Sequence, residues 1–198
     1  MQVTKKRRKL NNKGLTLIEM VVAIAIIGIF STVVMTFITS GANFYRKVSL
    51  TTKLQSDMQT TLESIENLIL DTNVKITYKS GGAAIDSDLG SAASVDKELT
   101  LERTNEEQPE SQKHPVTQIT WSASNQKLYY NEGTMDNGKL DIKITQQAVM
   151  TENVSGFQMD ISKAQSQGIV VFRLTLEKGD RKISQLYTVT LRNKVSTE

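Results

Sequence analysis

The sequence of 198 residues predicts an α+β fold, in which one long N-terminal helix packs on an antiparallel β-sheet. Three observations favour this class. An almost uninterrupted apolar run occupies residues 15–39, and an amphipathic segment with helical spacing follows it. From Val74 onward, apolar residues alternate with polar ones at the period of a strand. We therefore expect one helix and one globular domain.

The apolar run is long enough to cross a membrane as a helix. Its 25 residues contain one charged side chain, Glu19, and at 1.5 Å per residue they extend roughly 37 Å, whereas a hydrocarbon core is about 30 Å thick. A basic cluster precedes the run, and its excess of positive charge predicts a cytoplasmic N-terminus and an external remainder. The cluster consists of Lys5, Lys6, Arg7, Arg8, Lys9 and Lys13.

The formal net charge of +3 belongs to this N-terminal cluster. Six of the 24 basic residues and none of the 21 acidic residues lie in residues 1–14, so 18 basic and 21 acidic residues follow, a formal charge of −3. The body of the chain therefore offers no general basic field for nucleic acid. The absence of cysteine excludes disulfides, thiolate catalysis and cysteine metal sites.

Three interpretations of residues 15–39 are open. A plain membrane anchor gives Glu19 no role, although a carboxylate in a span costs roughly 2.5–3.5 kcal/mol and is usually functional. A secretory signal could be cleaved after Ser40-Gly41-Ala42, but the apolar region of such a signal is usually about 7–15 residues long. The third interpretation, a processed assembly helix, comes from a resemblance to a known family.

Residues 5–39 resemble the N-terminus of type IV prepilins and type II secretion pseudopilins, through the basic cluster, the segment Lys13-Gly14-Leu15-Thr16-Leu17-Ile18-Glu19 and the apolar run. The resemblance implies that a membrane aspartyl peptidase, the prepilin peptidase, cleaves between Gly14 and Leu15 and methylates the new N-terminus of Leu15. It also implies that Glu19 pairs with the freed ammonium group of Leu15, in the same or a neighbouring subunit, during assembly. The expected organisation is a leader at 1–14, a transmembrane helix at 15–39, its amphipathic continuation at 40–73 and a β-rich head at 74–198.

The amphipathic continuation carries an apolar stripe that we expect to dock on the sheet. The helix is predicted to end at Asp71-Thr72-Asn73, after up to about 57 residues. Gln55 interrupts the stripe, which consists of Phe44, Val48, Thr51, Met58, Leu62, Ile65 and Ile69.

About seven strands are predicted after the helix. Gly81-Gly82 and residues 86–91 are expected to form turns and loops, as is the polar stretch Asn105–Pro115, while Lys178-Gly179-Asp180-Arg181 predicts a hairpin turn. The predicted strands are Val74–Tyr78, Val116–Ser122, Lys127–Tyr130, Leu140–Thr145, Val154–Ile161, Ile169–Glu177 and Lys182–Val195, and Leu99 and Leu101 suggest a further short one.

The order of these elements also resembles that of the larger minor pilins and pseudopilins of the PilW/PulJ-like type. The likeness lies in the strand with Trp121, the hairpin into Leu128-Tyr129-Tyr130, the segment Glu152–Phe157 and the terminal hairpin. It implies a minor rather than a major filament subunit.

Few side chains suit catalysis or metal binding. His114 lies in a polar stretch beside Pro115, and we expect a solvated loop residue with no partner for nucleophilic catalysis. Asp86 and Asp88 offer two carboxylates, whereas Ca²⁺ takes six to eight oxygen ligands, so no metal is expected. Glu106, Glu107 and Glu110 are interpreted as a solvated acidic loop.

The aromatic side chains of the predicted sheet have two interpretations. Trp121, Tyr129 and Tyr130 could stack on single-stranded DNA, but packing in the sheet is favoured because aromatic residues are common in strands. Nucleic acid is therefore an unlikely partner. No cofactor is expected either.

The resemblance thus implies a non-enzymatic minor pilin or pseudopilin. It also implies the partners, which are other pilin subunits, the prepilin peptidase, the cytoplasmic membrane and an assembly platform, and a location first in the membrane and then in an extracytoplasmic filament. Two alternatives stay open: a bitopic surface protein whose β-domain binds a ligand without assembling, and a membrane-tethered hydrolase.

Overall fold

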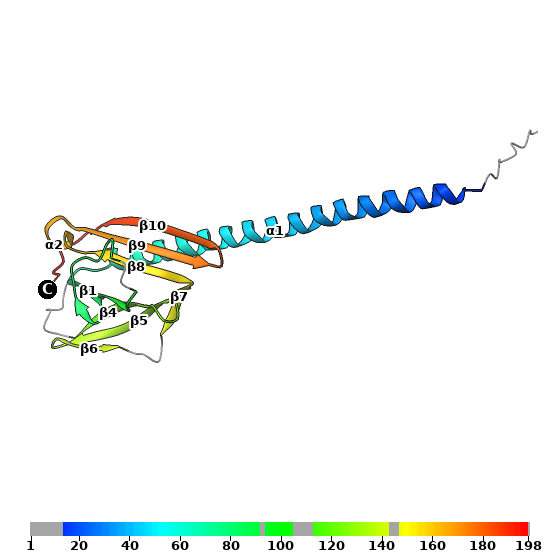
Figure 1. The fold of residues 1–198 in the computed structure, drawn as a ribbon. Coiled ribbons are helices and arrows are strands. Elements are labelled where there is room, and N and C mark those ends of the chain that lie inside the picture. Colours follow the sequence, from blue (N-terminus) through cyan, green and yellow to red (C-terminus); the bar gives the residue numbers. More distant parts are fainter. Residues whose placement is uncertain (1–13, 92–93, 105–112, 143–146, 198) are drawn as a thin grey trace, which may run out of the picture. The chain divides into compact units, whose positions relative to one another are not determined.

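The structure is a computed structural model that describes residues 14–91, 94–104, 113–142 and 147–197. The chain forms two units, which meet between Val48 and Ser49. The first unit holds the N-terminal part of helix α1 (Leu17–Leu70), and the larger unit holds its C-terminal part and the described strands (Figure 1). The predicted class is confirmed: α1 packs against antiparallel sheets in a pilin-like α+β fold.

Helix α1 ends where the sequence places a stop. Its last residue is Leu70, and the Thr72 hydroxyl then donates to the carbonyl of Leu68 at 3.0 Å, satisfying one of the free carbonyls of the last turn. The helix has 54 residues, slightly fewer than predicted. No proline interrupts it, which leaves its backbone hydrogen bonds intact.

The buried stripe of α1 begins later than predicted. Phe44 is 70% exposed and Val48 is 46% exposed, so these two positions do not dock on the sheet. Leu54, which the prediction omitted, removes the gap at Gln55 because it lies one residue before that position on the buried face. The residues of α1 that are buried are Leu54, Met58, Thr61, Leu62, Ile65 and Ile69.

The larger sheet has seven strands in the order β2-β1-β3-β4-β5-β6, and β7 also pairs with β5. Strand β5 is long enough to pair with β4 along one edge and with β6 and β7 on the other. All its pairings between strands are antiparallel. The strands are β1 (Lys75–Ser80), β2 (Ala83–Ala84), β3 (Lys97–Glu102), β4 (His114–Ser122), β5 (Lys127–Asp136), β6 (Lys139–Ile142) and β7 (Ala148–Glu152).

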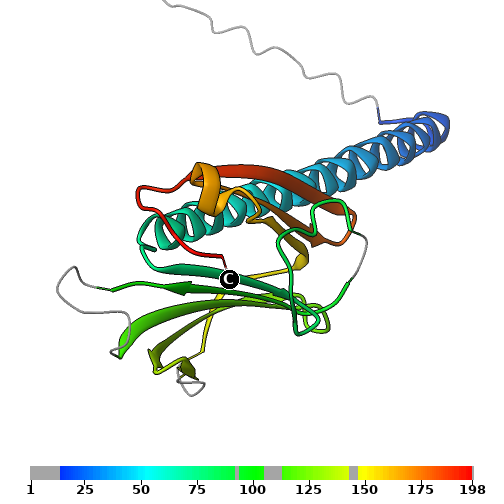
Figure 2. The same ribbon diagram turned by 90° about the vertical axis from the view of Figure 1, so that its left-hand side faces the viewer.

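The smaller sheet has three antiparallel strands in the order β10-β9-β8. They are β8 (Val154–Asp160), β9 (Ile169–Lys178) and β10 (Arg181–Thr190), and the short helix α2 (Ala164–Gln167) lies between β8 and β9 in the chain. Figure 2 shows the last turns of α1, in cyan, between β10 and β1. Apolar residues of α1 and of both sheets form one core cluster.

Both predicted glycine turns are confirmed. Gly81 and Gly82 have φ values of 59° and 85° and join the paired residues Ser80 and Ala83. Two successive positive φ values are those of a type I′ hairpin turn, which glycine adopts without steric cost. Lys178 pairs with Arg181 across Gly179-Asp180, as expected for the terminal hairpin.

The prediction of one sheet with about seven strands was wrong. The described residues contain two sheets, and β2, β7 and α2 were not predicted. The last strand ends at Thr190, because the chain then turns back and Ser196 forms a parallel bridge to Lys75 of β1. Residues 105–112 of the predicted polar loop, with Glu106, Glu107 and Glu110, lie outside the described residues, as does part of the predicted strand Leu140–Thr145.

Candidate assembly site and the polar network of the larger unit

The N-terminus of α1 is closed by a capping box that the sequence analysis missed. Thr16 precedes the helix, and its hydroxyl accepts a hydrogen bond from the backbone N–H of Glu19 at 3.3 Å. In return, the Glu19 carboxylate accepts from the backbone N–H and the hydroxyl of Thr16, each at 2.8 Å. This reciprocal pairing satisfies two N–H groups that a helix otherwise leaves free. The signal was present as Thr-x-x-Glu before an apolar run.

The predicted cleavage site precedes this cap. Residues 14–16 have no regular secondary structure, and Leu15 is 74% exposed. A methyl group built on Gly14 would meet no described atom within 4 Å. Among the described residues, none would crowd a side chain at Gly14, and the peptide bond between Gly14 and Leu15 lies before the first helical residue, Leu17. A peptidase would have to unwind the helix to reach a bond within it.

The apolar part of α1 satisfies its own polar groups. The hydroxyls of Ser31, Thr36 and Thr39 each donate to the carbonyl four residues earlier, at 2.7, 2.9 and 3.0 Å. The Thr32 hydroxyl donates to Ile29 at 2.7 Å. Such internal bonds allow hydroxyls to lie in hydrocarbon, where no water can replace them. An 18-residue window of α1 has a mean hydropathy of 2.7 and is wholly unburied, which is consistent with a single-pass anchor.

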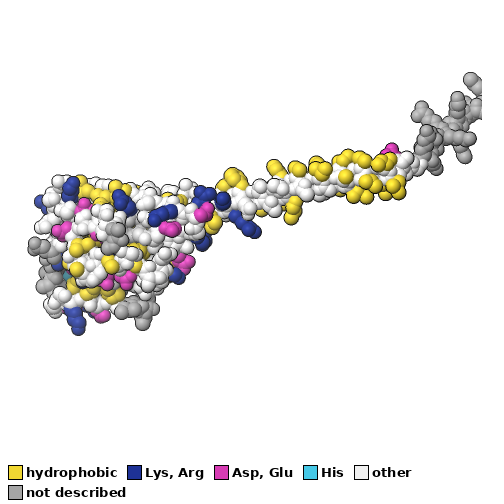
Figure 3. Space-filling model, viewed as in Figure 1, with side chains coloured by type: hydrophobic (Ala, Val, Ile, Leu, Met, Phe, Trp, Pro, Cys, Tyr) yellow, Lys and Arg dark blue, Asp and Glu magenta, His cyan; other side chains and the backbone are white. Residues whose placement is uncertain are grey.

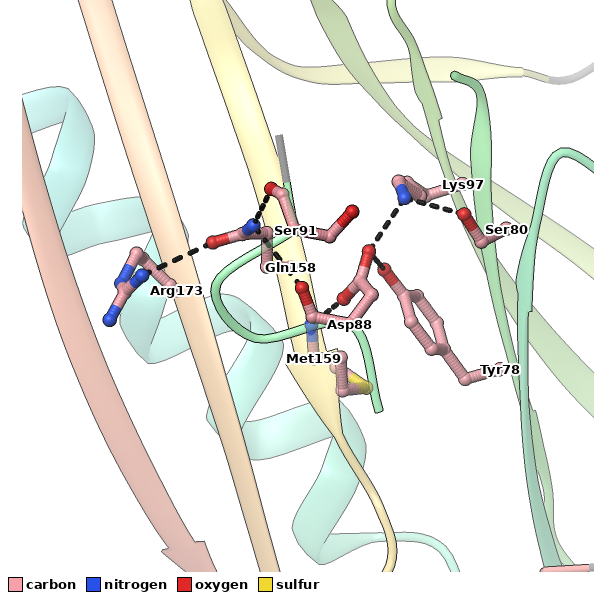
Figure 4. A network of polar contacts seen from close by, with 8 residues as sticks. All are labelled: Tyr78, Ser80, Asp88, Ser91, Lys97, Gln158, Met159 and Arg173. Atoms are coloured by element: carbon pink, nitrogen blue, oxygen red, sulfur yellow. Dashed lines mark hydrogen bonds and ion pairs between the residues drawn. The ribbon is translucent and has the colours of Figure 1, made fainter. Parts of the chain in front are cut away.

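The larger unit contains a buried polar network around Asp88 (Figure 4). One carboxylate oxygen of Asp88 accepts from the Lys97 ammonium at 2.6 Å and from the Tyr78 hydroxyl at 3.0 Å. The other oxygen accepts from the backbone N–H of Met159 at 2.8 Å. The side chains of Lys97 and Asp88 are 1% and 5% exposed. The network therefore fastens the loop after β2 to β3 and to β8, and so joins the two sheets.

A second layer of hydrogen bonds holds the same loop. The Gln158 amide donates to the carbonyls of Asp88 and Ser91, and its oxygen accepts from Arg173 at 3.3 Å. The Lys97 ammonium also donates to the Ser80 hydroxyl. Because Asp88 already forms an ion pair with Lys97 and accepts hydrogen bonds from Tyr78 and Met159, its carboxylate oxygens are occupied by partners within the protein. Among the described residues, no group of three His, Cys, Asp or Glu side chains is arranged to hold a metal ion.

The prediction for His114 was wrong. His114 is the first residue of β4 and is 4% exposed, and its Nε2 lies 3.0 Å from a carboxylate oxygen of Glu102 on β3. It is therefore a buried, hydrogen-bonded residue of the sheet rather than a solvated loop residue. Its neighbours Pro115 and Val116 continue the same strand, which begins two residues earlier than predicted.

The aromatic residues follow the packing interpretation. Trp121 is 2% exposed, and its indole N–H donates to the carbonyl of Val154 at 3.0 Å, which joins β4 to β8. A buried indole cannot stack on a base. Tyr129 and Tyr130 are half-buried, and their hydroxyls bond to Asn125 and Glu132 on the same hairpin.

Replacing Tyr78 by Phe should reveal the network through pH. Burial, and then the Asp88 carboxylate beside it, raise the pKa of the Tyr78 phenol far above its usual value near 10. The folded pKa exceeds the unfolded one, so the stability from Tyr78 is fully present below about pH 10 and is lost as the pH rises towards the folded pKa. At pH 7, Tyr78→Phe should cost about 1.5–3 kcal/mol, the usual loss of a hydrogen bond to a charged group.

The test is to unfold the full chain with urea in detergent and to monitor unfolding through the fluorescence of Trp121, the only tryptophan. The stability difference between the parent and Tyr78→Phe should shrink above pH 10. A difference that stays constant between pH 7 and pH 11 would contradict a buried, protonated Tyr78 hydroxyl with a raised pKa.

Comparison with known families places a motif at the start of α1. Residues 9–35 match the prokaryotic N-terminal methylation motif. No curated protein and no solved structure matched the chain. The matched residues include the predicted cleavage site, the capping box and most of the apolar run. The chain therefore carries the N-terminal methylation motif of prepilin-type proteins at the start of a helix that is apolar enough to anchor it in a membrane.

Proposed function

We propose that this chain is a minor pilin or pseudopilin, a structural subunit without enzymatic activity. The prepilin peptidase cleaves it between Gly14 and Leu15 and methylates Leu15. Before assembly, α1 holds the subunit in the cytoplasmic membrane, with the N-terminus inside and the larger unit outside. The subunit then enters a filament by packing its apolar helix among those of related subunits. The methylation motif at residues 9–35 is the observation that carries this proposal.

The geometry of the N-terminus supports processing at this position. The peptidase must reach an extended peptide bond, and residues 14–16 precede the first turn of α1. Cleavage there would leave Thr16 and Glu19 on the mature chain, so the capping box would survive. The new ammonium group of Leu15 would then lie next to the residue whose N–H the Glu19 carboxylate already accepts.

A subunit of a filament needs an uncovered helix. The apolar side chains of α1 between Leu17 and Ile38 are exposed, and water would disfavour such a surface unless lipid or neighbouring helices cover it. The order of the strands around Trp121 and the terminal hairpin favours a minor subunit over a major one. In the described residues, the only histidine is committed to Glu102, which gives no support to the alternative of a hydrolase.

The mature N-terminus decides between the interpretations. We expect mass spectrometry of the chain from membranes to find a first residue Leu15 that carries one added methyl group, and we expect an uncut chain in cells that lack the prepilin peptidase. A mature chain that begins at Asn43 would indicate a secretory signal. An uncut chain in both strains would favour a bitopic surface protein that does not assemble.

A further inference from the structure

Two aromatic and two basic side chains follow the apolar part of α1. Phe44 and Tyr45 are 70% and 74% exposed, and Arg46 and Lys47 are exposed as well. Figure 3 shows basic side chains, in dark blue, where the yellow apolar stretch of the helix ends. None of the four side chains belongs to the core cluster of the larger unit. We call Phe44, Tyr45, Arg46 and Lys47 the collar.

The collar lies at the distance along α1 that a bilayer requires. From Met20, the first apolar residue after Glu19, to Phe44 the helix rises about 36 Å. A hydrocarbon core takes about 30 Å of this length, and the remaining ~6 Å is the depth of one headgroup layer. Side chains of a helix tilt towards its N-terminus, so those of the collar lean back towards the membrane.

The arrangement around the helix favours lipid over a protein partner. Successive residues of a helix are rotated by about 100°, so four consecutive side chains point in all directions around its axis. A protein groove contacts one face of a helix and would select side chains three or four residues apart. A bilayer surrounds the helix and can contact all four.

The chemistry of the collar matches an anionic headgroup. Aromatic rings are enriched at the boundary between hydrocarbon and water, and guanidinium and ammonium groups bind phosphate oxygens. The sequence between Glu19 and Asp57 contains no acidic residue, so Arg46 and Lys47 give this end of the span a formal positive charge.

We propose that the collar binds the anionic phospholipid headgroups of the leaflet opposite the N-terminus and thereby sets the depth of α1 in the bilayer. This proposal rests on the membrane insertion in the proposed function. It makes the lipid composition of that leaflet a determinant of how firmly the subunit is held before it enters a filament.

The test uses the mature chain, residues 15–198, in vesicles of neutral phosphatidylcholine and in vesicles that also contain phosphatidylglycerol. The chain has no cysteine, so Asn43→Cys places a single spin label one residue before the collar. Collisions of this label with a water-soluble, uncharged nickel complex report its depth. In anionic vesicles, Arg46→Gln with Lys47→Gln should raise the collision rate roughly twofold or more, because both headgroup contacts are lost. In neutral vesicles the substitutions should change it little.

Lys53→Gln is the matched control, since Lys53 is exposed on the same helix but lies about 9 Å beyond Lys47. It should leave the label at the depth of the parent. The collar proposal would be wrong if the label of the parent chain lay at the same depth in both kinds of vesicle. It would also be wrong if Lys53→Gln changed the collision rate as much as the double substitution of Arg46 and Lys47. Neither result would contradict membrane insertion. A chain that floats with neither kind of vesicle in a density gradient would instead contradict insertion, and the collar with it.

Discussion

Replacing Lys97 by Met should destabilise the larger unit by about 3–5 kcal/mol. The substitution preserves the length of the side chain but removes the ammonium group that lies 2.6 Å from Asp88. The carboxylate is then left in the interior with two hydrogen bonds and no counter-ion. Because Asp88 also holds β8 through Met159, the loss should weaken the contact between the two sheets. Urea unfolding followed by Trp121 fluorescence measures the effect.

Two controls separate buried charge from lost packing. Adding Asp88→Asn to Lys97→Met removes the uncompensated charge and should restore part of the lost stability. Lys127→Met breaks the exposed pair between Lys127 and Glu152, which are 2.7 Å apart, and should cost much less stability because water screens this pair. If the Lys97 and Lys127 variants lost equal stability, the Asp88 network would not be an important brace.

Glu19→Gln should lower the yield of subunit incorporated into filaments about tenfold or more, even though the start of the helix stays capped. Glutamine can take the place of glutamate in a capping box, so this change removes the negative charge and keeps the hydrogen-bond acceptor. Under the proposed function, the ammonium group of the processed Leu15 would then have no counter-ion in the apolar core of the filament. The measurement is the amount of processed subunit in sheared filaments relative to that in membranes.

The other substitutions at the cap separate the two roles of Glu19. Glu19→Ala removes both charge and acceptor and should be at least as defective as Glu19→Gln. Thr16→Ala leaves the charge but breaks the capping box, which typically costs about 1 kcal/mol of helix stability, so its effect on incorporation should be smaller. Normal incorporation of Glu19→Gln would mean that Glu19 acts only as a cap.

The elements that sequence could predict are those with a local cause. Apolar residues between Leu15 and Thr39 specify a helix without reference to any other segment, and Gly81-Gly82 and Gly179-Asp180 specify turns through backbone conformation. Strand β7 has no such cause, because it becomes a strand by pairing with β5. The division into two sheets likewise depends on which strands meet across the core.

The polar contacts of the larger unit depend on sheet register. Lys97 meets Asp88, and His114 meets Glu102, only after β3 has paired with β1 and β4. A signal was nevertheless present, since Lys97 shares the alternation of Leu99 and Leu101 and so occupies a core-facing position. By contrast, the capping box of Thr16 and Glu19 could have been predicted from the residues of a single helical turn.

The return of the chain to β1 has a consequence for synthesis. The N–H of Ser196 donates to Val74, and its carbonyl accepts from Ile76, each at 2.9 Å, while Val195 packs into the core. The start of β1 is therefore synthesised long before Ser196, which pairs with its edge. Contacts so distant in sequence form late, so this part of the edge of β1 should stay unpaired until residue 196 has been made, although β3 can pair with the other edge earlier. Ribosomes that stall before residue 195 should therefore release chains that proteases remove.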